Sequence, residues 1–355
     1  MARSGDAVTG HVTRTAVAIL GLLVVMACGA MGCAGSGTGT VGASAATSPA
    51  TTASPSPSPV RTATLPDPRR RMLLGAYVSL PGEPTVEAAI EQRERAIGRH
   101  YDLELTYYNW TDPFPDSGEA AIVAHGRTPV MAWYGPDKDP GSSHTLAEIT
   151  DGADDSWIAR QAAAIKAFGY PIYLRPMPEM NENSYGYSGD PRAFIAAWRH
   201  IHDIFSRVGA ANVVWVWCPN LLPDNWDSYY PGNAYVDVIG VDGYSNTTYT
   251  WQTFKQMFSG FFEHFAAFSG HKPQMVVETG TNSGAGHAAA GIGSAASYID
   301  GMRSYLHDVA GPRYRVIGVC WFDTVMNGYD WRVDQTSAAW RAWLALARDP
   351  YFGGH

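Results

Sequence analysis

Short apolar runs alternate with amphipathic segments along most of this chain. Most of these runs are continuously apolar, which is typical of parallel strands covered on both faces. Eight runs predict strands, at Leu74–Val78, Leu103–Tyr107, Pro129–Tyr134, Ile172–Arg175, Val213–Cys218, Val236–Val241, Gln274–Val277 and Val316–Phe322.

Helix-like segments separate nearly all of these runs. They are Thr85–Gly98, Ser117–His125, Trp157–Phe168, Pro191–Val208, Thr253–Phe268, Ser294–His307 and Ser337–Ala347. Asp190 before Pro191 is a typical helix start, with a capping acid followed by a proline at the first helical position. The connection after Val213–Cys218 is interrupted by Pro223 and Pro231 and predicts no clear helix.

Eight strands that alternate with helices predict a (β/α)8 TIM barrel, with one domain spanning residues 71–355. A doubly wound open sheet is the alternative. The sequence has no GxGxxG or Walker motif that would support a nucleotide-binding version of that sheet.

The first residues predict a targeting signal rather than part of the fold. Basic residues precede an apolar run, Thr15–Ala27, which fits a secretory signal and is short for a membrane span. Cys28 follows a small residue, with an aliphatic residue three positions before it, and this resembles the lipobox of bacterial lipoproteins. Residues 1–33 are therefore interpreted as a lipoprotein signal, with Cys28 lipidated and Cys33 as a second candidate. Plain secretion with two incidental cysteines is the alternative.

A linker is predicted between this signal and the barrel, over residues 34–70. It consists mostly of Gly, Ala, Ser, Thr and Pro and includes SPSPSP at Ser54–Pro59. Such a segment cannot bury enough apolar surface to fold. Together the two segments predict a protein held at the outer surface of a membrane by a lipid anchor, with no other membrane contact.

Charge and cysteine content exclude several other classes of protein. The net charge of −8, with no basic run longer than Arg69–Arg71, makes nucleic acid an unexpected partner. Cys218 and Cys320 lie in apolar runs and are expected to be buried free thiols. No Cys/His cluster has zinc spacing, so neither a metal nor an organic cofactor is expected.

Two glutamates stand at the predicted strand ends. Glu179 follows the fourth strand in a stiff Pro-rich segment, and Glu278 follows the seventh. Function in a TIM barrel lies at the carboxyl ends of the strands, so both carboxylates are expected to face one cavity. Such a pair is what glycoside hydrolysis requires, as acid and as nucleophile or base. A rim ion pair between Glu179 and Arg175 is the structural alternative.

Further residues at this rim are candidates for binding a sugar. Aromatic rings pack against the apolar face of a pyranose, and polar side chains bind its hydroxyls. The candidates are Trp133, Arg175, Asn181, Trp217, Tyr244 and Trp321. For each aromatic residue, packing in the core is the alternative.

Several motifs resemble those of glycoside hydrolase family 26, the β-mannanase family of retaining (β/α)8 glycosidases. The resemblance covers Leu73–Ala347 and rests on RPMPEMN, VWCPN, YVDVIGVDGY, VVETG and CWFDTVMNGYDWRVD. It implies that Glu179 is the general acid/base and Glu278 the nucleophile. It also implies that Tyr244 hydrogen-bonds the nucleophile and that Trp321 is an aromatic floor beneath the sugar.

Two positions depart from the family pattern. Pro178 stands where the family usually has His, and Glu182 where a Gly is often found. The chain is therefore identified as a divergent member, expected to be a monomeric retaining endo-β-1,4-mannanase acting on polysaccharide. Mixed-linkage β-glucan or β-xylan are alternative substrates. A lipoprotein that binds polysaccharide without cleaving it is the alternative from another class.

Overall fold

A computed structural model describes residues 62–136, 145–246, 251–270, 272–282 and 293–353. The predicted signal, with Cys28 and Cys33, and the linker up to residue 61 lie outside these residues. Residues 62–70, also predicted as linker, are described, and here Pro68 is buried and its carbonyl accepts a hydrogen bond from the Tyr351 hydroxyl at 2.7 Å. None of the described helices is long and apolar enough to cross a membrane.

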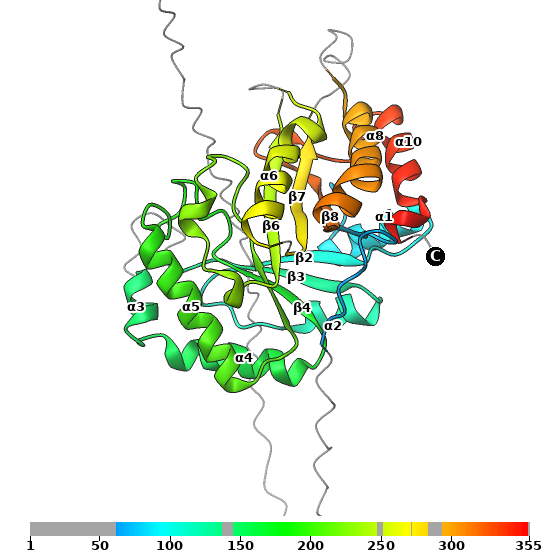
Figure 1. Cartoon of the computed structure of the whole chain (residues 1–355). Coiled ribbons are helices and arrows are strands. Elements are labelled where there is room, and N and C mark those ends of the chain that lie inside the picture. Colours follow the sequence, from blue (N-terminus) through cyan, green and yellow to red (C-terminus); the bar gives the residue numbers. More distant parts are fainter. Residues whose placement is uncertain (1–61, 137–144, 247–250, 271, 283–292, 354–355) are drawn as a thin grey trace, which may run out of the picture. The chain divides into compact units, whose positions relative to one another are not determined.

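The core of the fold is a closed barrel of parallel strands. Each strand pairs with the next, and β1 pairs with β8, which closes the sheet and excludes the doubly wound alternative (Figure 1). The strands are β1 Leu73–Ser79, β2 Leu103–Tyr108, β3 Thr128–Trp133, β4 Ile172–Pro176, β5 Val213–Trp217, β6 Val238–Ser245, β7 Gln274–Thr281 and β8 Val316–Met326. The predicted TIM barrel is confirmed.

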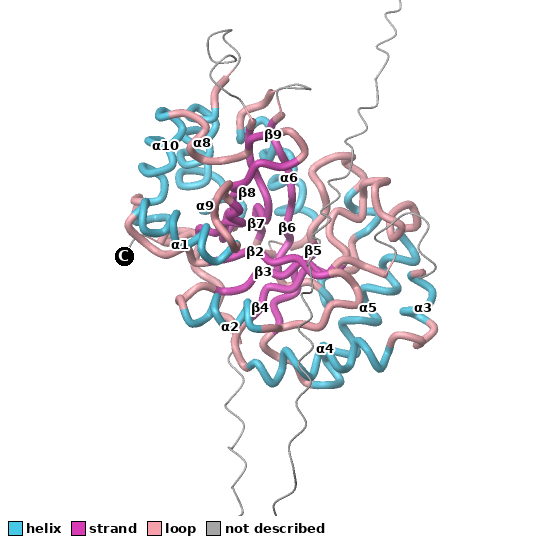
Figure 2. The backbone as a smooth tube through the Cα atoms, turned by 180° about the vertical axis from the view of Figure 1, so that it is seen from behind, coloured by secondary structure: helices cyan, strands magenta, loops and turns pink. Residues whose placement is uncertain are grey.

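Helices surround the strands, which lie at the centre of the molecule (Figure 2). Those expected are α1 Val86–Ile97, α2 Ser117–Ala124, α4 Asp155–Phe168, α5 Pro191–Val208, α6 Phe254–Phe268, α8 Ala295–Tyr305 and α10 Ser337–Ala347. The side chain of Asp190 accepts hydrogen bonds from Arg192 N and Ala193 N, so the predicted cap of α5 is confirmed.

The remaining elements are short. After β5 the chain forms two 3-10 turns, η1 Trp226–Tyr229 and η2 Asn233–Tyr235, as the two prolines suggested. Five elements lie outside the predicted segments or extend beyond one: α3 Leu146–Thr150, the π-helix η3 Leu306–Ala310, α9 Gly311–Tyr314, the final turn η4 Pro350–Phe352, and β9 Tyr329–Asp330, which pairs antiparallel with β8.

Strand alternation divides the side chains between the barrel interior and the helix layer. Gly75 pairs with Cys320 and Tyr77 with Phe322, and the Tyr77 and Phe322 rings stack inside the barrel with centroids 5.1 Å apart. The intervening residue of β8, Trp321, contacts Trp343 of α10 instead. Successive strand residues point to opposite faces, so one position decides whether a side chain reaches the site.

Close packing inside the barrel predicts a stability effect at Gly75. A Cβ there would lie 2.5 Å from Cys320 Sγ and 2.7 Å from Leu103 Cβ. We expect Gly75→Ala to destabilise the protein by about 1–3 kcal/mol through overpacking, measured by urea unfolding. Gly301→Ala in α8 is the matched control, since a Cβ there meets nothing within 4 Å. It should raise stability by about 0.5–1 kcal/mol, and equal effects of the two changes would contradict this packing.

Candidate active site

Glu278 lies on β7 at an irregularity of the sheet. Val241 pairs with Val276 but Asp242 pairs with Glu278, so β7 carries one extra residue there. Bulges of this kind re-aim side chains and occur beside active sites. The bulge places Glu278 within the strand, which continues to Thr281, and turns its carboxylate toward the barrel interior.

Three side chains donate to the Glu278 carboxylate. The Tyr244 hydroxyl donates to Oε2 at 2.6 Å, which confirms the contact that the family resemblance implied for Tyr244. The Tyr107 hydroxyl donates to Oε1 at 3.1 Å, and Arg175 Nη2 donates to the same oxygen. The three donors come from three strands, so this carboxylate is fixed in position and supplied with the partners that a negative charge needs.

Arg175 lies inside the barrel rather than on the rim. Its side chain is only 1% exposed, and its Nη1 donates to Asp242 Oδ2 at 2.7 Å while Nη2 contacts Glu278. The guanidinium thus bridges the acids of β6 and β7. Among the described ion pairs Arg175 has none with Glu179, which removes that structural alternative. The arrangement also corrects the prediction that Arg175 binds substrate, because its buried head has no surface for a sugar. Its role is to hold Glu278.

Glu179 lies in the turn that follows β4, and the backbone of this turn is strained. Met177 and Glu179 have φ values of 48° and 57°, in the left-handed region that non-glycine residues rarely adopt. Such residues cost about 1–3 kcal/mol each and persist where the surroundings hold them. Here Glu179 N donates to Cys218 O at 2.8 Å and the Tyr187 hydroxyl donates to Pro178 O at 2.8 Å.

Two side chains hold the Glu179 carboxyl group. Asn220 Nδ2 donates to Oε1 at 2.8 Å, and the Tyr185 hydroxyl donates to Oε2 at 3.0 Å. Burial raises the pKa of Glu179 above its ordinary value, and the negative charge of Glu278 raises it further, against the opposing effects of Asn220, Arg175 and Tyr185. The two glutamates therefore interact electrostatically, and within the described part of the chain a cationic side chain binds Glu278 but not Glu179.

The raised pKa of Glu179 has a measurable consequence. If Glu179 must be protonated to act as an acid, the alkaline limb of kcat/KM should lie above the ordinary glutamate value of about 4.3. A carboxyl whose pKa is raised on folding stabilises the protein below its unfolded pKa, and this stabilisation is lost as pH rises through the folded pKa. We therefore expect Glu179→Gln to be more stable than the wild type at pH 8, measured by thermal unfolding. Equal stability at pH 8 would contradict a raised pKa.

Asn181 serves the turn rather than a substrate. Its Nδ2 donates to Asn220 O at 2.9 Å and to Pro223 O at 2.8 Å, and its Oδ1 accepts from Asn220 N at 2.8 Å. Both amide hydrogens are thus used, and the residue is buried. The structure corrects the predicted sugar contact: Asn181 positions Asn220, which in turn holds Glu179.

Three tryptophans predicted to bind sugar are core residues. Trp133, Trp217 and Trp321 are fully buried. Each indole N–H donates to a backbone carbonyl, that of Trp110, Tyr229 and Trp331 respectively. The predictions placed them correctly along their strands but on the wrong face. The helix-facing side of each strand leaves no ring surface for a substrate, so the predicted aromatic floor at Trp321 is wrong for this structure.

Several residues that the structure places at the site are not among the predicted site residues. Tyr107 near the end of β2 and Asp242 within β6 face the interior, and strand alternation could have identified them. Asn220 follows β5 in the VWCPN motif. Tyr185 lies in the irregular segment after Glu179, and no periodic pattern in the sequence indicates its direction.

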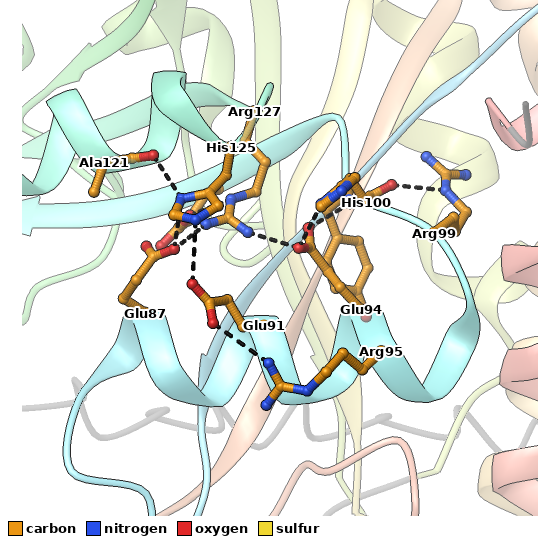
Figure 3. A network of polar contacts seen from close by, with 11 residues as sticks. Glu87, Glu91, Glu94, Arg95, Arg99, His100, Ala121, His125 and Arg127 are labelled. Carbon is orange, nitrogen blue, oxygen red and sulfur yellow. Dashed lines mark hydrogen bonds and ion pairs between the residues drawn. The ribbon is translucent and has the colours of Figure 1, made fainter.

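A separate polar network lies outside the barrel, on α1 and α2. Among the described residues, one group of potential metal ligands comes together here: atoms of Glu87, Glu91 and His125 lie within 4.8 Å of one another. Arg127 binds Glu87, and Arg95 binds Glu91 at 3.4 Å (Figure 3). Because both carboxylates already pair with a guanidinium, we interpret the group as an ion-pair network.

Comparison with known proteins agrees with the motifs. The family model described as Glycosyl hydrolase family 26 matches residues 146–284, a segment that includes Glu179, Asn220, Tyr244 and Glu278. This match covers the strands β4 to β7, which contribute most of the polar contacts described above.

Two curated relatives illustrate the range of similarity. Endoglucanase H of Acetivibrio thermocellus is 33% identical over 76% of this chain and 30% of its own length. A protein named mannan endo-1,4-beta-mannosidase A and B, of Caldalkalibacillus mannanilyticus, is 28% identical over 38% of this chain and 25% of its own. The chain therefore spans less than a third of the length of either relative.

Solved structures share the fold. The catalytic domain of a family 26 endo-β-1,4-mannanase from Bacillus sp. JAMB-750 aligns over 81% of this chain and 89% of its own, with a TM-score of 0.61 and 13% identity. A modular endo-β-1,4-mannanase from Cellulomonas fimi aligns over 80% of this chain and 72% of its own, with a TM-score of 0.59 and 17% identity.

Proposed function

Because the chain belongs to glycoside hydrolase family 26, we propose that it is an endo-acting glycoside hydrolase that cleaves β-linked polysaccharide with retention. The observation that carries this proposal is that the carboxyl groups of Glu179 and Glu278 have different electrostatic surroundings. Burial, and next the charge of Glu278, raises the pKa of Glu179, while Arg175, Tyr107 and Tyr244 all donate to Glu278. One carboxyl is thereby suited to keep a proton and the other to attack.

In the first step, Glu179 gives its proton to the glycosidic oxygen. The bond from the anomeric carbon to that oxygen breaks, and an oxygen of Glu278 bonds to the anomeric carbon on the opposite face of the sugar. In the second step, Glu179 removes a proton from water, the water oxygen bonds to the anomeric carbon, and Glu278 is released. Two inversions restore the original configuration.

Arg175, Tyr107 and Tyr244 support this sequence by fixing the nucleophile. As positive charge develops on the sugar, the Glu278 carboxylate loses its negative charge to the new covalent bond. When that bond breaks, the carboxylate becomes negative again and the three donors stabilise its charge. Asn220 and Tyr185 hold Glu179 in the same way. Small errors of position matter, because a displacement of about 1 Å can cost roughly 10²-fold in rate.

The proposed substrate is β-1,4-mannan. This proposal is supported by the family match and by relatives named mannan endo-1,4-beta-mannosidase. A β-glucan is the second candidate, because the relative named Endoglucanase H matches a larger share of this chain at higher identity. Pro178 also supports β-glucan as a candidate. The family usually has histidine at this position, and a proline has no such ring nitrogen to hydrogen-bond a sugar.

A polysaccharide panel tests the activity and the substrate together. Purified protein is incubated with β-mannan, mixed-linkage β-glucan, carboxymethyl cellulose and β-1,3-xylan, and reducing ends are measured over time. We expect reducing ends to be released from mannan or β-glucan. Because the proposed cleavage is internal, the viscosity of the solution should fall before most of the reducing ends appear. Proton NMR of the first products should show the β-anomer. Binding without turnover on every substrate would instead favour the non-catalytic alternative.

We also propose that the protein is secreted and anchored by a lipid on Cys28. The proposal is supported only by the sequence before the barrel, where an apolar run precedes a lipobox-like cysteine. A labelled fatty acid should be incorporated into the protein expressed in a bacterial host that processes lipoproteins. Cys28→Ala should abolish this labelling, and Cys33→Ala should not.

A further inference from the structure

The outer surface of the barrel between β5 and β6 exposes apolar side chains. The turns η1 and η2 take the place of a helix there, and α6 packs against these turns. Phe268, the last residue of α6, is 45% exposed, and Leu222, near the start of the connection, is 54% exposed. Exposed apolar side chains that gather on one surface mark interaction sites, whereas isolated ones do not.

Four rings gather at this surface and are here called the aromatic row: Trp226, Tyr230, His264 and Phe268. Ring centroids lie 5.8 Å apart from Trp226 to His264, 5.5 Å from His264 to Phe268 and 5.4 Å from Phe268 to Tyr230. All four rings also contact Phe265, which is fully buried. The row is therefore continuous, and a single core residue supports it.

Polar groups hold two of the rings and lie beside them. His264 Nε2 donates to Asp227 Oδ1 at 2.6 Å, and the Tyr230 hydroxyl donates to Asn233 Oδ1 at 2.6 Å. The side chains of His264 and Asp227 are 37% and 51% exposed. A sugar needs rings for the apolar face of its pyranose and polar groups for its hydroxyls. The aromatic row offers both, on side chains that are already ordered, which lowers the cost of binding.

The aromatic row is continuous with the candidate active site. Trp226 Nε1 donates to Asn220 O at 3.1 Å, and Asn220 Nδ2 donates to Glu179 Oε1 at 2.8 Å. Leu222 N donates to Asn220 Oδ1 at 3.1 Å, so this exposed side chain belongs to the same turn. Because the acid protonates the departing oxygen, the departing part of a polysaccharide lies on the side of Glu179. The row begins at the residue that holds this acid.

The size of the aromatic row argues against a protein partner. An aromatic side chain buries about 150–250 Å² when it is fully covered, and none of the four residues is more than 45% exposed. The row therefore offers at most roughly 450 Å². One partner in a stable protein interface contributes about 800 Å². A single glycan chain is slender and needs less surface.

We propose that the aromatic row binds one chain of a neutral β-linked polysaccharide outside the active site, on the side of the departing part. This inference rests on the proposed function for the identity of its ligand, but binding at the row requires no turnover. A polymer that occupies the active site and the row together is bound at two places on one molecule. Its affinity should therefore exceed that of an oligosaccharide too short to reach the row.

The test removes exposed rings in full-length protein that carries Glu278→Gln, so that the polymer is not consumed. Electrophoresis in native gels that contain β-mannan or mixed-linkage β-glucan measures the apparent Kd. We expect Phe268→Ala to raise this Kd by about 3- to 10-fold, and Phe268→Ala with Tyr230→Ala to raise it further. Phe268→Tyr keeps a ring and should bind like its parent.

Tyr170→Ala is the matched control, because Tyr170 is also an exposed aromatic residue, at 38%, but belongs to the connection between α4 and β4. It should leave the Kd unchanged. Unchanged polymer affinity in a folded Phe268→Ala protein overturns the proposal, and so does a parent protein that neither polysaccharide retards. A dimer in sedimentation velocity that Phe268→Ala dissociates would assign the row to a second copy of the chain and also overturn it.

Cleavage separates the aromatic row from the active site. With Glu278 intact, Phe268→Ala should raise KM for the polymer and leave kcat/KM for a dinitrophenyl β-glycoside unchanged, because this small substrate does not reach the row. An active enzyme whose KM for the polymer is insensitive to Phe268→Ala refutes the row and leaves the hydrolase intact. Binding that depends on Phe268, in a protein that cleaves no polysaccharide, supports the row and refutes only the hydrolase.

Discussion

Glu278→Gln is expected to lower kcat by about 10⁴-fold or more on any polysaccharide that the protein cleaves. Loss of a nucleophile from a unit of cooperating groups commonly has an effect of this size. The substitution keeps the shape of the side chain and its contact with Tyr244, but an amide does not form the covalent intermediate. Initial rates of reducing-end release, with substrate at saturation, measure the loss.

The protein should survive this change. Arg175 keeps its 2.7 Å ion pair with Asp242 when the charge of Glu278 is removed. We expect a loss of stability smaller than that of Asp323→Asn, because Asp242 remains buried beside Arg175, whereas the carboxylate that remains beside Arg93, that of Asp334, is partly exposed. Substantial activity in a folded Glu278→Gln protein would eliminate Glu278 as the nucleophile.

Asp323→Asn on β8 is the matched control, because it also neutralises a buried acid near a strand end. Asp323 faces the helix layer and binds Arg93 through both oxygens, at 2.7 and 3.2 Å. Breaking a buried ion pair is expected to cost about 3 kcal/mol of stability and to leave kcat nearly unchanged. The two variants should thus separate activity from stability, as strand alternation requires.

The sequence predicts the barrel well because its signal is repeated. All eight apolar runs became strands, and Pro191–Val208 and Ser337–Ala347 became helices with the predicted bounds. Each strand contributes several apolar residues to the pattern, so an error at one residue leaves the prediction intact. The strand ends were less certain: β7 continues to Thr281 and β8 to Met326, beyond the last apolar residue of each run.

The direction of single side chains was predicted less well, since it depends on one position in the strand. Trp321 and Phe322 are adjacent, but only Phe322 faces the interior, where it stacks on Tyr77. A bulky aromatic residue at a strand end therefore did not indicate a sugar site. Gly75 faces the crowded interior, where a Cβ would collide with Cys320 Sγ. Since Gly75 pairs with Cys320, the next residue of β8, Trp321, must face the helix layer.

The contacts in loops were beyond any periodic pattern. Tyr185 reaches Glu179 across an irregular turn, and Arg175 pairs with acids 67 and 103 residues away. The stiffness of the segment around Glu179 was visible in its two prolines. The left-handed conformations of Met177 and Glu179, which aim the carboxyl group, became apparent only in the folded chain. The same turn also buries Glu182, so this loop determines both where the acid lies and which charges surround it.

Glu179→Ala is expected to lower kcat/KM for polysaccharide by about 10²–10⁴-fold, the range typical of a lost general acid. The loss should depend on the leaving group, because a dinitrophenolate departs without a proton. With a dinitrophenyl β-glycoside, Glu278 should still form the covalent intermediate in a rapid burst, followed by slow release because no base activates water.

Azide distinguishes this role from simple damage to the site. In Glu179→Ala, azide needs no general base, and the lost carboxylate no longer repels it, so it should attack the intermediate and restore turnover. Attack from the face opposite Glu278 should give the β-glycosyl azide. The same salt should leave the wild type unchanged, since its carboxylate repels the anion and already activates water. An equal loss for both leaving groups, with no azide product, would show that Glu179 supports the site without transferring a proton.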